Sequence, residues 1–436
     1  MHLKRLFSSI VLIVSLFSLN FSSFLINQAQ AQDISQFDPQ EISLLEFNEE
    51  ISVYRVYYEN AEEIGLLMSF DLFEFNNLEE KYVLVAVNQR ELMQIKKMGF
   101  TVEFDNEETE NFELLLTSSQ DQIQTIPGYS CYRTVEETYA TAANLAASYP
   151  DLASWFDVGD SWERSVGQPD GYDLFILKLT NKSIPGDKPK LFITAAIHAR
   201  EYTTAELATR FAEYLLNNYN VDADVTWLLD YHEIHLMLQT NPDGRKEAES
   251  GTSWRKNTNE NYCGVTSSYR GADLNRNYSF YWNSCSGCSS GYPCDSTYRG
   301  PSPASEPEIQ AVQAYMRSIF PDQRDPSLTS SAPNDAMGIF VDLHSYSQLV
   351  LWPWGMTSSL APNNSGLQTL GRKFAFFNNY TPQRAYQLYG TDGDSTDFAY
   401  GDLGIAAYTF ELGTAFFQSC STFEGTILPT NLQALL

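Results

Sequence analysis

The sequence predicts an α/β fold, with a mixed, mostly parallel sheet flanked by helices and preceded by a small α+β unit of split βαβ type. Near-continuous apolar segments at residues 232–239, 339–343 and 406–410 are typical of strands buried on both faces of a largely parallel sheet. Segments with helical periodicity alternate with the strands, as in α/β domains. A chain of 436 residues is also longer than a domain with a single hydrophobic core usually is, so we expect two folded units after a leader.

The leader occupies residues 1–31, which have the features of a signal peptide. Lys4 and Arg5 precede an apolar run that continues to Ile26, and Ala29-Gln30-Ala31 has the small-x-small pattern of a cleavage site. The alternative is an uncleaved membrane anchor, since the run is long for a signal peptide. No later segment reaches the ~20 apolar residues of a membrane span. We therefore expect a secreted protein, extracellular or periplasmic, that has no contact with the membrane after cleavage.

The small α+β unit lies within residues 32–104. Its signals follow the order β-α-β-β-α-β, which is the order of a split βαβ motif. The predicted elements are strand 53–58, helix 61–69, strands 72–75 and 82–87, helix 89–98 and strand 101–104. Residues 105–125 are acidic and rich in Gln, without Pro or Gly, so they predict a mobile or helical linker.

The larger unit is predicted to span residues 126–436. It contains helical patterns at 135–149 and 203–216 and strands at 174–179 and 191–196, besides the three apolar strands given above. In open α/β sheets, ligands bind at the carboxyl ends of the strands. The residues that can carry chemistry follow these strands, so we expect the site at that edge.

Charge and cysteine content narrow the class of protein further. A net charge of −28 argues against nucleic acid and anionic membranes as partners. Six cysteines in an exported chain indicate disulfides, although spacing alone does not choose the pairs. Cys285-Ser-Gly-Cys288 has the spacing of a redox or zinc-knuckle motif, but no second CxxC or paired His lies near it. We therefore favour a structural role for these two cysteines.

The histidines indicate a metal site. His198 and Glu201 follow the strand 191–196, and an imidazole with a carboxylate three residues later supplies two ligand types of a catalytic zinc. His232 and His235 lie inside a predicted strand, where residues three apart point to opposite faces, so we interpret them as ordinary strand residues. His344 comes directly after the strand 339–343. It is the predicted third ligand.

Further motifs stand in a fixed order around these residues. Besides His198-x-x-Glu201 and His344-Ser345-Tyr346, the chain contains Thr240-Asn-Pro-Asp-Gly244, Trp254-Arg255-Lys256, Asp273-Leu-Asn275-Arg276-Asn277, Tyr298-Arg-Gly-Pro301 and Thr409-Phe-Glu411-Leu412. Over about residues 126–425 they resemble the zinc metallocarboxypeptidases of the pancreatic A/B type and their bacterial relatives. The split βαβ unit is similar to the inhibitory prosegment of that family. The resemblance implies a secreted proenzyme with prosegment 32–104, activation linker 105–125 and a carboxypeptidase-like catalytic domain 126–436.

The resemblance also implies a role for each site residue. One zinc per chain would be held by His198, Glu201 and His344, and Asp273 would accept the other N–H of His198. Glu411 would be the general base, and Arg255 would stabilise the oxyanion.

The remaining implied roles concern the substrate. Asn275 and Arg276 would clamp its terminal carboxylate, and Tyr389 would close over it. The pocket for the departing side chain would be lined by Leu351, Gly355, Asp394, Thr396 and Thr409.

The expected function is hydrolysis of the C-terminal bond of peptides and proteins by a monomer that a protease activates. Thr396 stands where the basic-specific members carry Asp, so we expect a broad preference: hydrophobic first, basic tolerated through Asp394, acidic refused. One alternative is a carboxypeptidase for cell-wall peptides. Another is a non-catalytic member of the fold that binds peptides. The sequence gives no prediction about calcium.

Two features depart from the family pattern. A Cys-rich insertion lies between Arg276 and Tyr298, and by resemblance we pair Cys263 with Cys294. The pair Cys131–Cys420 is added as a hypothesis. The family's C-terminal helix is expected to begin only where the sequence ends, near Leu436, and therefore to be short or incomplete.

The linker indicates an unusual activation step. Between Lys97 and Arg133 there is no Lys or Arg, so a trypsin-like protease has no site there. Exposed tracts of small and polar residues are where proteolysis is expected. We predict maturation within residues 110–125 by a glutamate-specific or subtilisin-like protease.

Overall fold

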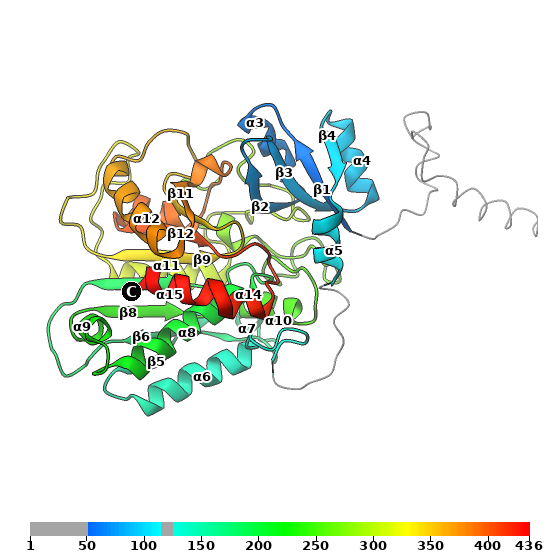
Figure 1. The fold of residues 1–436 in the computed structure, drawn as a ribbon. Coiled ribbons are helices and arrows are strands. Elements are labelled where there is room, and N and C mark those ends of the chain that lie inside the picture. Colours follow the sequence, from blue (N-terminus) through cyan, green and yellow to red (C-terminus); the bar gives the residue numbers. More distant parts are fainter. Residues whose placement is uncertain (1–50, 115–124) are drawn as a thin grey trace, which may run out of the picture. The chain divides into compact units, whose positions relative to one another are not determined.

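The computed structural model describes residues 51–114 and 125–436 (Figure 1). The predicted signal peptide, the first part of the predicted prosegment and residues 115–124 of the linker lie outside the described residues. No helix among those that are described has both the length and the apolar character needed to cross a membrane.

The N-terminal unit is a four-stranded antiparallel sheet in the order β2-β3-β1-β4. Its elements are β1 (Ser52–Tyr57), α3 (Ala61–Ile64), η3 (Gly65–Leu67), β2 (Asp71–Asn77), β3 (Tyr82–Val87), α4 (Gln89–Lys97) and β4 (Thr101–Phe104). Asn88 begins α4 with a capping box, in which its side chain accepts the Glu91 N–H and Glu91 accepts the Asn88 N–H. The predicted β-α-β-β-α-β order is confirmed.

The first part of the linker forms a helix, α5 (Asn106–Leu114). Asp105 precedes it and accepts a hydrogen bond from Arg55 Nε at 2.7 Å. Thr109 Oγ1 accepts the N–H of Val53 at 2.9 Å, and Phe112 is buried against Phe73. Of the two predicted states of the linker, the helical one is therefore observed over residues 106–114.

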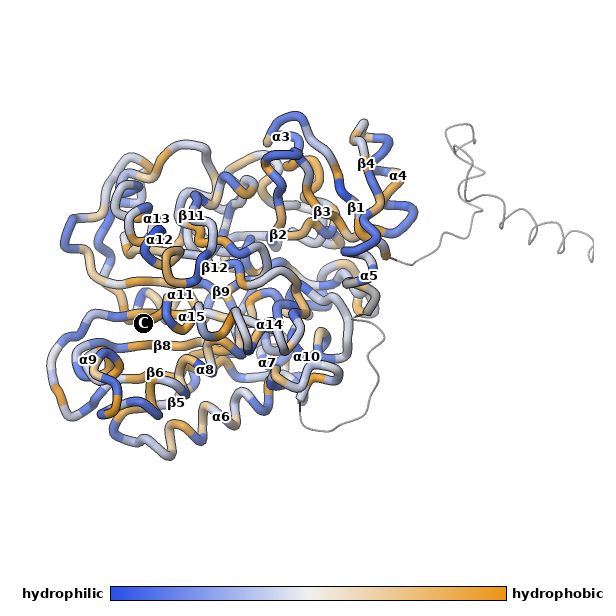
Figure 2. Tube along the Cα trace, viewed as in Figure 1, coloured by the Kyte–Doolittle hydropathy of each residue, from blue (hydrophilic) through white to orange (hydrophobic). Residues whose placement is uncertain are grey.

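The larger unit, which the proposed function treats as the catalytic unit, contains an eight-stranded mixed sheet in the order β11-β10-β12-β9-β7-β8-β6-β5. Its strands are β5 (Ala153–Asp160), β6 (Asp173–Leu179), β7 (Lys190–Thr194), β8 (Glu233–Met237), β9 (Ile339–His344), β10 (Leu349–Trp352), β11 (Thr381–Arg384) and β12 (Ala406–Glu411). The four central strands are parallel, and β8 and β9 are hydrophobic along most of their length (Figure 2). The edge strands β5 and β11 and the inner strand β10 were not predicted, because β10 and β11 are only four residues long and β5 is interrupted by a bulge.

Helices flank this sheet. They are α6 (Val135–Ser148), α7 (Trp162–Ser165), α8 (Tyr202–Asn218), α9 (Ala223–Tyr231), α10 (Pro242–Glu249), η4 (Leu274–Arg276), α11 (Pro307–Ile319), α12 (Asn364–Asn378), η5 (Ala385–Gln387), α13 (Ser395–Leu403), α14 (Cys420–Thr422), η6 (Phe423–Ile427) and α15 (Leu428–Leu435). α6, α8, α15 and α12 contact one another in this order along one face of the sheet, with α11 behind it (Figure 1).

One expectation about the C-terminus is wrong, whereas the disulfide pairs are confirmed. α14, η6 and α15 form a helical run over residues 420–435 that packs on α12 and α8, so the C-terminal helix starts well before Leu436. Cys263 is bonded to Cys294 and Cys131 to Cys420, as expected. Cys285 and Cys288 form a third disulfide.

Candidate metal centre and active site

Two neighbouring parallel strands bring the predicted metal ligands together. His344 is the last residue of β9, and His198 lies in the turn after β7, which pairs with β9 in parallel. Glu201 ends that turn at the start of α8. The rings of His198 and His344 stand 4.8 Å apart, centroid to centroid. The carboxyl ends of β7 and β9 therefore build the site, as expected for an open α/β sheet.

The three side chains present a ligand set that fits zinc. His198 Nδ1 is 2.7 Å from Glu201 Oε1, and His344 Nδ1 is 3.3 Å from Glu201 Oε2. One ligand atom from each residue lies within 4.8 Å of the other two, and among residues 51–114 and 125–436 this is the one such cluster that can hold a metal. Burial would raise the pKa of Glu201, but His198 and His344 outweigh that effect and hold its pKa at about 2. Two imidazoles and an ionised carboxylate are typical ligands of catalytic zinc.

A second carboxylate faces the outer nitrogen of each imidazole. His198 Nε2 is 3.1 Å from Asp273 Oδ1, as predicted. His344 Nε2 is 3.1 Å from Asp342 Oδ2, a residue that was not predicted. An imidazole that donates its Nε2–H to a carboxylate presents the Nδ1 lone pair to a metal. Both carboxylates therefore orient the imidazoles toward Glu201.

Asp342 connects the metal centre with the substrate pocket. Its Oδ1 accepts a hydrogen bond from Thr194 Oγ1 on β7 at 2.7 Å, and its Oδ2 accepts one from Ser395 Oγ. Ser395 is the first residue of α13, beside Asp394 and Thr396. One sequence signal could have found Asp342. It stands two residues before His344, so both side chains point to the same face of a strand that is otherwise apolar.

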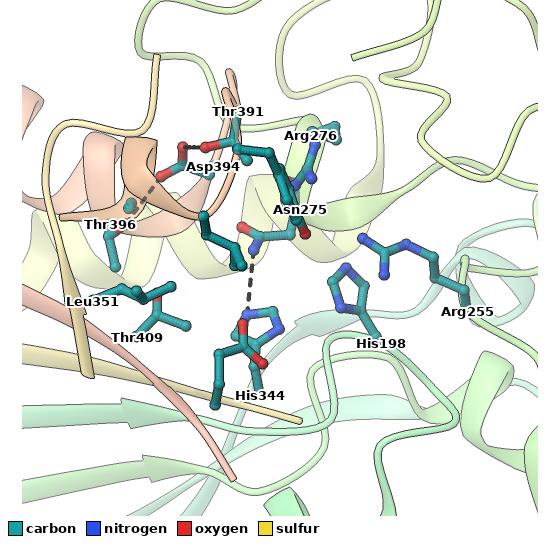
Figure 3. Close-up of a pocket in the computed structure, with 14 residues that line it drawn as sticks. His198, Arg255, Asn275, Arg276, His344, Leu351, Thr391, Asp394, Thr396 and Thr409 are labelled. Atoms are coloured by element: carbon teal, nitrogen blue, oxygen red, sulfur yellow. Dashed lines mark hydrogen bonds between the residues drawn. The ribbon is translucent and has the colours of Figure 1, made fainter. Parts of the chain in front are cut away.

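Arg255 lies beside His198 (Figure 3). Its Nε and Nη2 donate to Asp273 Oδ2 at 3.1 and 3.0 Å, and its backbone carbonyl accepts the N–H of Ala199. Burial would raise the pKa of Asp273, but Arg255 and His198 keep that pKa far below its ordinary value. Asp273 thus orients both a predicted metal ligand and the predicted oxyanion donor.

Asn275 and Arg276 both reach the site from η4. Asn275 Oδ1 accepts the N–H of Ser395 at 2.9 Å, and its Nδ2 lies 3.2 Å from His344 Nε2. Arg276 donates from Nη1 to the Asn275 carbonyl, and its buried Nε has no hydrogen-bond partner among the described residues. The Asn275 amide oxygen is therefore already engaged with α13, whereas Arg276 retains unused donors.

Glu411 is the last residue of β12, and it pairs in register with His344 on β9. It is buried and lines the same pocket as the two histidines. The full lining of this pocket is His198, Arg255, Asn275, Arg276, His344, Leu351, Ala385, Leu388, Tyr389, Thr391, Asp394, Thr396, Thr409 and Glu411. Ala385, Leu388 and Thr391 were not predicted. Glu201, Asp273 and Gly355 are not among the lining residues.

Asp394 forms the polar end of the predicted side-chain pocket. As the N-cap of α13, its Oδ1 accepts the Asp397 N–H at 2.8 Å and the Thr396 hydroxyl at 3.0 Å. Its Oδ2 accepts the Thr391 hydroxyl at 2.8 Å (Figure 3). A Cβ on Gly355 would stand 2.2 Å from Thr391 Oγ1 and 2.8 Å from Asp394 Oδ2. Gly355 therefore makes room for these side chains.

The two other histidines of residues 51–114 and 125–436 take no part in the site. His235 is buried in β8, where its Nδ1 pairs with the Tyr315 hydroxyl at 2.6 Å. His232 follows α9 and its ring packs against Trp227. The interpretation of both as ordinary structural residues is consistent with these positions, although His232 lies one residue before the strand.

The fold and the site define an α/β metalloenzyme with a buried His-Glu-His centre. The family profile for zinc carboxypeptidases matches residues 138–435. Carboxypeptidase B of Astacus astacus is 32% identical over 311 residues, covering 69% of this chain and 93% of that protein. Carboxypeptidase A2 of Mus musculus is 30% identical over 330 residues, covering 73% and 71%.

Solved structures agree on the fold. Carboxypeptidase A from Helicoverpa armigera superimposes with a TM-score of 0.71 at 21% identity, covering 89% of this chain and 96% of that chain. The chain belongs to the zinc carboxypeptidase family. It is thus a metallocarboxypeptidase, a hydrolase that acts on peptide C-termini and whose family uses zinc.

The carboxylate of Asp342 gives the first testable prediction. Asp342→Asn replaces an acceptor for the His344 Nε2–H, so we expect zinc to bind about 10- to 100-fold more weakly. Competition with a chromogenic chelator measures the zinc affinity of the purified chain. Thr194→Val is the control. It removes a hydrogen bond to the other oxygen of Asp342, so it should lower the zinc affinity much less. Equal zinc affinity in Asp342→Asn and the parent would show that Asp342 does not orient His344.

Proposed function

We propose that the chain is the secreted proenzyme of a zinc exopeptidase that removes single residues from the C-termini of peptides and proteins. The observation that carries the proposal is that one pocket joins the two histidines of the metal group to Glu411 and Arg276. A cation with unused donors at the far side of a pocket fits a free terminal carboxylate. A substrate bound in this way presents its last peptide bond to the metal group.

The protein residues divide the chemistry among them. Zinc, held by His198, Glu201 and His344, would acidify a bound water and polarise the scissile carbonyl. Glu411 is the base that takes the proton of the attacking water and passes it to the leaving amine. Arg255 donates to the oxygen that becomes negative, and Asp273 keeps this guanidinium in place.

The pocket also suggests a preference for the departing side chain. Leu351 on β10 pairs in register with Thr409 on β12, which gives a wall of apolar and small groups suited to aliphatic and aromatic side chains. Asp394 adds one carboxylate, already bonded to Thr391 and Thr396. We propose that hydrophobic residues are preferred, that Lys and Arg are tolerated through Asp394, and that acidic residues are refused.

Contacts of the N-terminal unit support its role as an inhibitory prosegment. Both oxygens of Asp71 bind the buried Arg200, at 2.6 and 2.9 Å. Phe73 packs edge-on against Tyr346, which follows the ligand His344 in the chain by two residues. Asn76 Nδ2 donates to the Leu388 carbonyl at 2.6 Å, beside Tyr389.

Apolar packing extends these polar contacts. Leu388 and Tyr389 belong to a core cluster whose other members come mostly from the N-terminal unit. Two hydroxyls of the catalytic unit, Ser296 and Thr297, donate to carbonyls of Phe70 and Met68. β2 and its flanks thus cover the approach to the pocket, so polymeric substrate requires removal of this unit.

Glu411→Gln tests the catalytic assignment. The amide keeps the shape of the side chain but cannot accept the proton, so we expect kcat to fall by about 100-fold or more while zinc content is unchanged. A mixed peptide library, digested by the activated protein and read by mass spectrometry, should show stepwise loss of C-terminal residues. Internal cuts, or near-normal kcat in zinc-loaded Glu411→Gln, would contradict the proposal.

Asp394→Asn tests the preference. Asn is as good an N-cap as Asp, so α13 should remain intact while the charge is lost. We expect kcat/KM to fall for substrates ending in Arg and to stay near the parental value for those ending in Phe or Leu. Substrates ending in Glu measure whether the negative charge excludes acids. An unchanged ratio of Arg to Phe turnover would exclude Asp394 as the residue that recognises basic side chains.

Limited proteolysis tests the activation site. The predicted window is 110–125, and Phe112 is buried at its N-terminal end, so we expect the cut at the C-terminal end of α5, after Glu113, or in the residues that follow it. A glutamyl endopeptidase or subtilisin should release activity with a new N-terminus in the window, whereas trypsin should not. Replacing Glu110 and Glu113 by Gln should block only the glutamyl enzyme. Full activation by trypsin alone, with a start outside the window, would refute this prediction and leave the catalytic assignment intact.

A further inference from the structure

The insertion that carries Cys285 and Cys288 is attached to the substrate loop, which we define as residues 386–394. Asp392 lies in this loop and is fully buried. Its Oδ2 accepts the N–H groups of Ser284 and Cys285 at 2.7 and 3.1 Å, and its Oδ1 accepts the Ser289 hydroxyl. Three donors from residues 284–289 therefore converge on one carboxylate between Tyr389 and Asp394. Neither the metal centre nor the pocket lining uses this carboxylate.

The disulfide itself touches the loop next to Tyr389. Cys285 and Cys288 close a four-residue ring, and Cys288 is 4% exposed. A Cβ built on Gly390 would stand 2.9 Å from Cys288 Sγ, which is closer than real Cβ contacts allow. The loop backbone therefore rests directly on the sulfur, one residue after the tyrosine expected to close over the substrate.

The loop has a second support that is lost on activation. In the full chain, Asn76 of the N-terminal unit donates to the Leu388 carbonyl. Removal of that unit deletes this hydrogen bond and the apolar packing on Tyr389. The bonds to Asp392 and the contact with Cys288 remain. Backbone bonds also remain, among them those from Tyr386 N to Trp354 O, from Thr391 N to Gly355 O and from Tyr278 N to Gly393 O.

We propose that the Cys285–Cys288 ring, acting through Asp392 and Gly390, is a positioning element that fixes the substrate loop and with it Tyr389. The inference rests on the proposed function, in which Tyr389 bonds the terminal carboxylate of the substrate. Opening the ring loosens the hydrogen-bond donors to Asp392, which lie in and beside the ring, and it loosens the sulfur contact under Gly390. Tyr389 then spends less time in the closed position, and the carboxylate is bound more weakly.

Two variants and one control test the proposal in the zinc-loaded protein after limited proteolysis. Cys285→Ser/Cys288→Ser opens the ring, and Ser289→Ala removes one donor to Asp392 while leaving the disulfide, which covers the case in which the first variant misfolds. Tyr292→Ala is the control, because Tyr292 lies in the same insertion but is 76% exposed. For the ring-opened variant we expect KM to rise about 10-fold, the effect of losing a hydrogen bond to a charged group, with a smaller change in kcat.

A double-mutant cycle and hydrogen exchange decide how the ring acts. In a Tyr389→Phe background the KM effect should largely disappear, because the ring then has no hydroxyl to position. In the full chain, amides of residues 386–394 should exchange faster when the ring is open and at the parental rate in Tyr292→Ala. Unchanged exchange and KM in both test variants would overturn the proposal. So would a KM effect that persists undiminished in Tyr389→Phe.

The same data separate this inference from the proposed function. If the parent releases no C-terminal residue, the proposed function fails, but the exchange rates of residues 386–394 still decide whether the ring fixes the loop. If the parent is an active exopeptidase and exchange is insensitive to the ring, only the inference fails.

Discussion

The parallel pairing of β7, β9 and β12 is the constraint on which the active site depends. It places His344 next to the turn that carries His198, and it places Glu411 in register with His344. Each of these side chains is buried, so its orientation must be fixed by hydrogen bonds within the protein and not by water. For the two histidines, Asp273 and Asp342 meet that requirement from outside the ligand set. Hydrogen bonds within the protein thereby fix the geometry expected of a metal site.

The sequence revealed what is local and missed what depends on distant partners. The apolar strands and the turn from His198 to Glu201 carry their signals within a few residues, and both are found where they were expected. Thr391 and Leu388 gave no such signal, because they reach the pocket through a loop that an insertion more than 90 residues upstream supports (the bonds to Asp392 span 103 to 108 residues). Short edge strands such as β11 were missed for the same reason: they are defined by their neighbour and not by their own composition.

The family resemblance predicted which residue types stand at the site, but it did not predict the hydrogen-bond partners of these residues. Asn275 stands at the expected place, but its amide is bonded to Ser395 and lies beside His344. Gly355 borders the pocket by leaving space for Thr391 and is not part of the lining. Asp394 caps a helix as well as facing the pocket, so its charge has a structural partner before any substrate arrives. That one side chain both caps a helix and faces the pocket can be recognised only from the three-dimensional arrangement of the side chains.

The close approach of Gly65 to Gly287 has an evolutionary consequence. Gly287 has a φ of +73°, so its own backbone favours glycine. Gly65 has a helical φ of −57°, which any residue adopts, yet a Cβ there would stand 3.2 Å from the Gly287 backbone. The steric limit at position 65 therefore comes from the ring and not from the local conformation. Without the Cys-rich segment, position 65 would have room for a side chain, so positions 65 and 287 are expected to vary together.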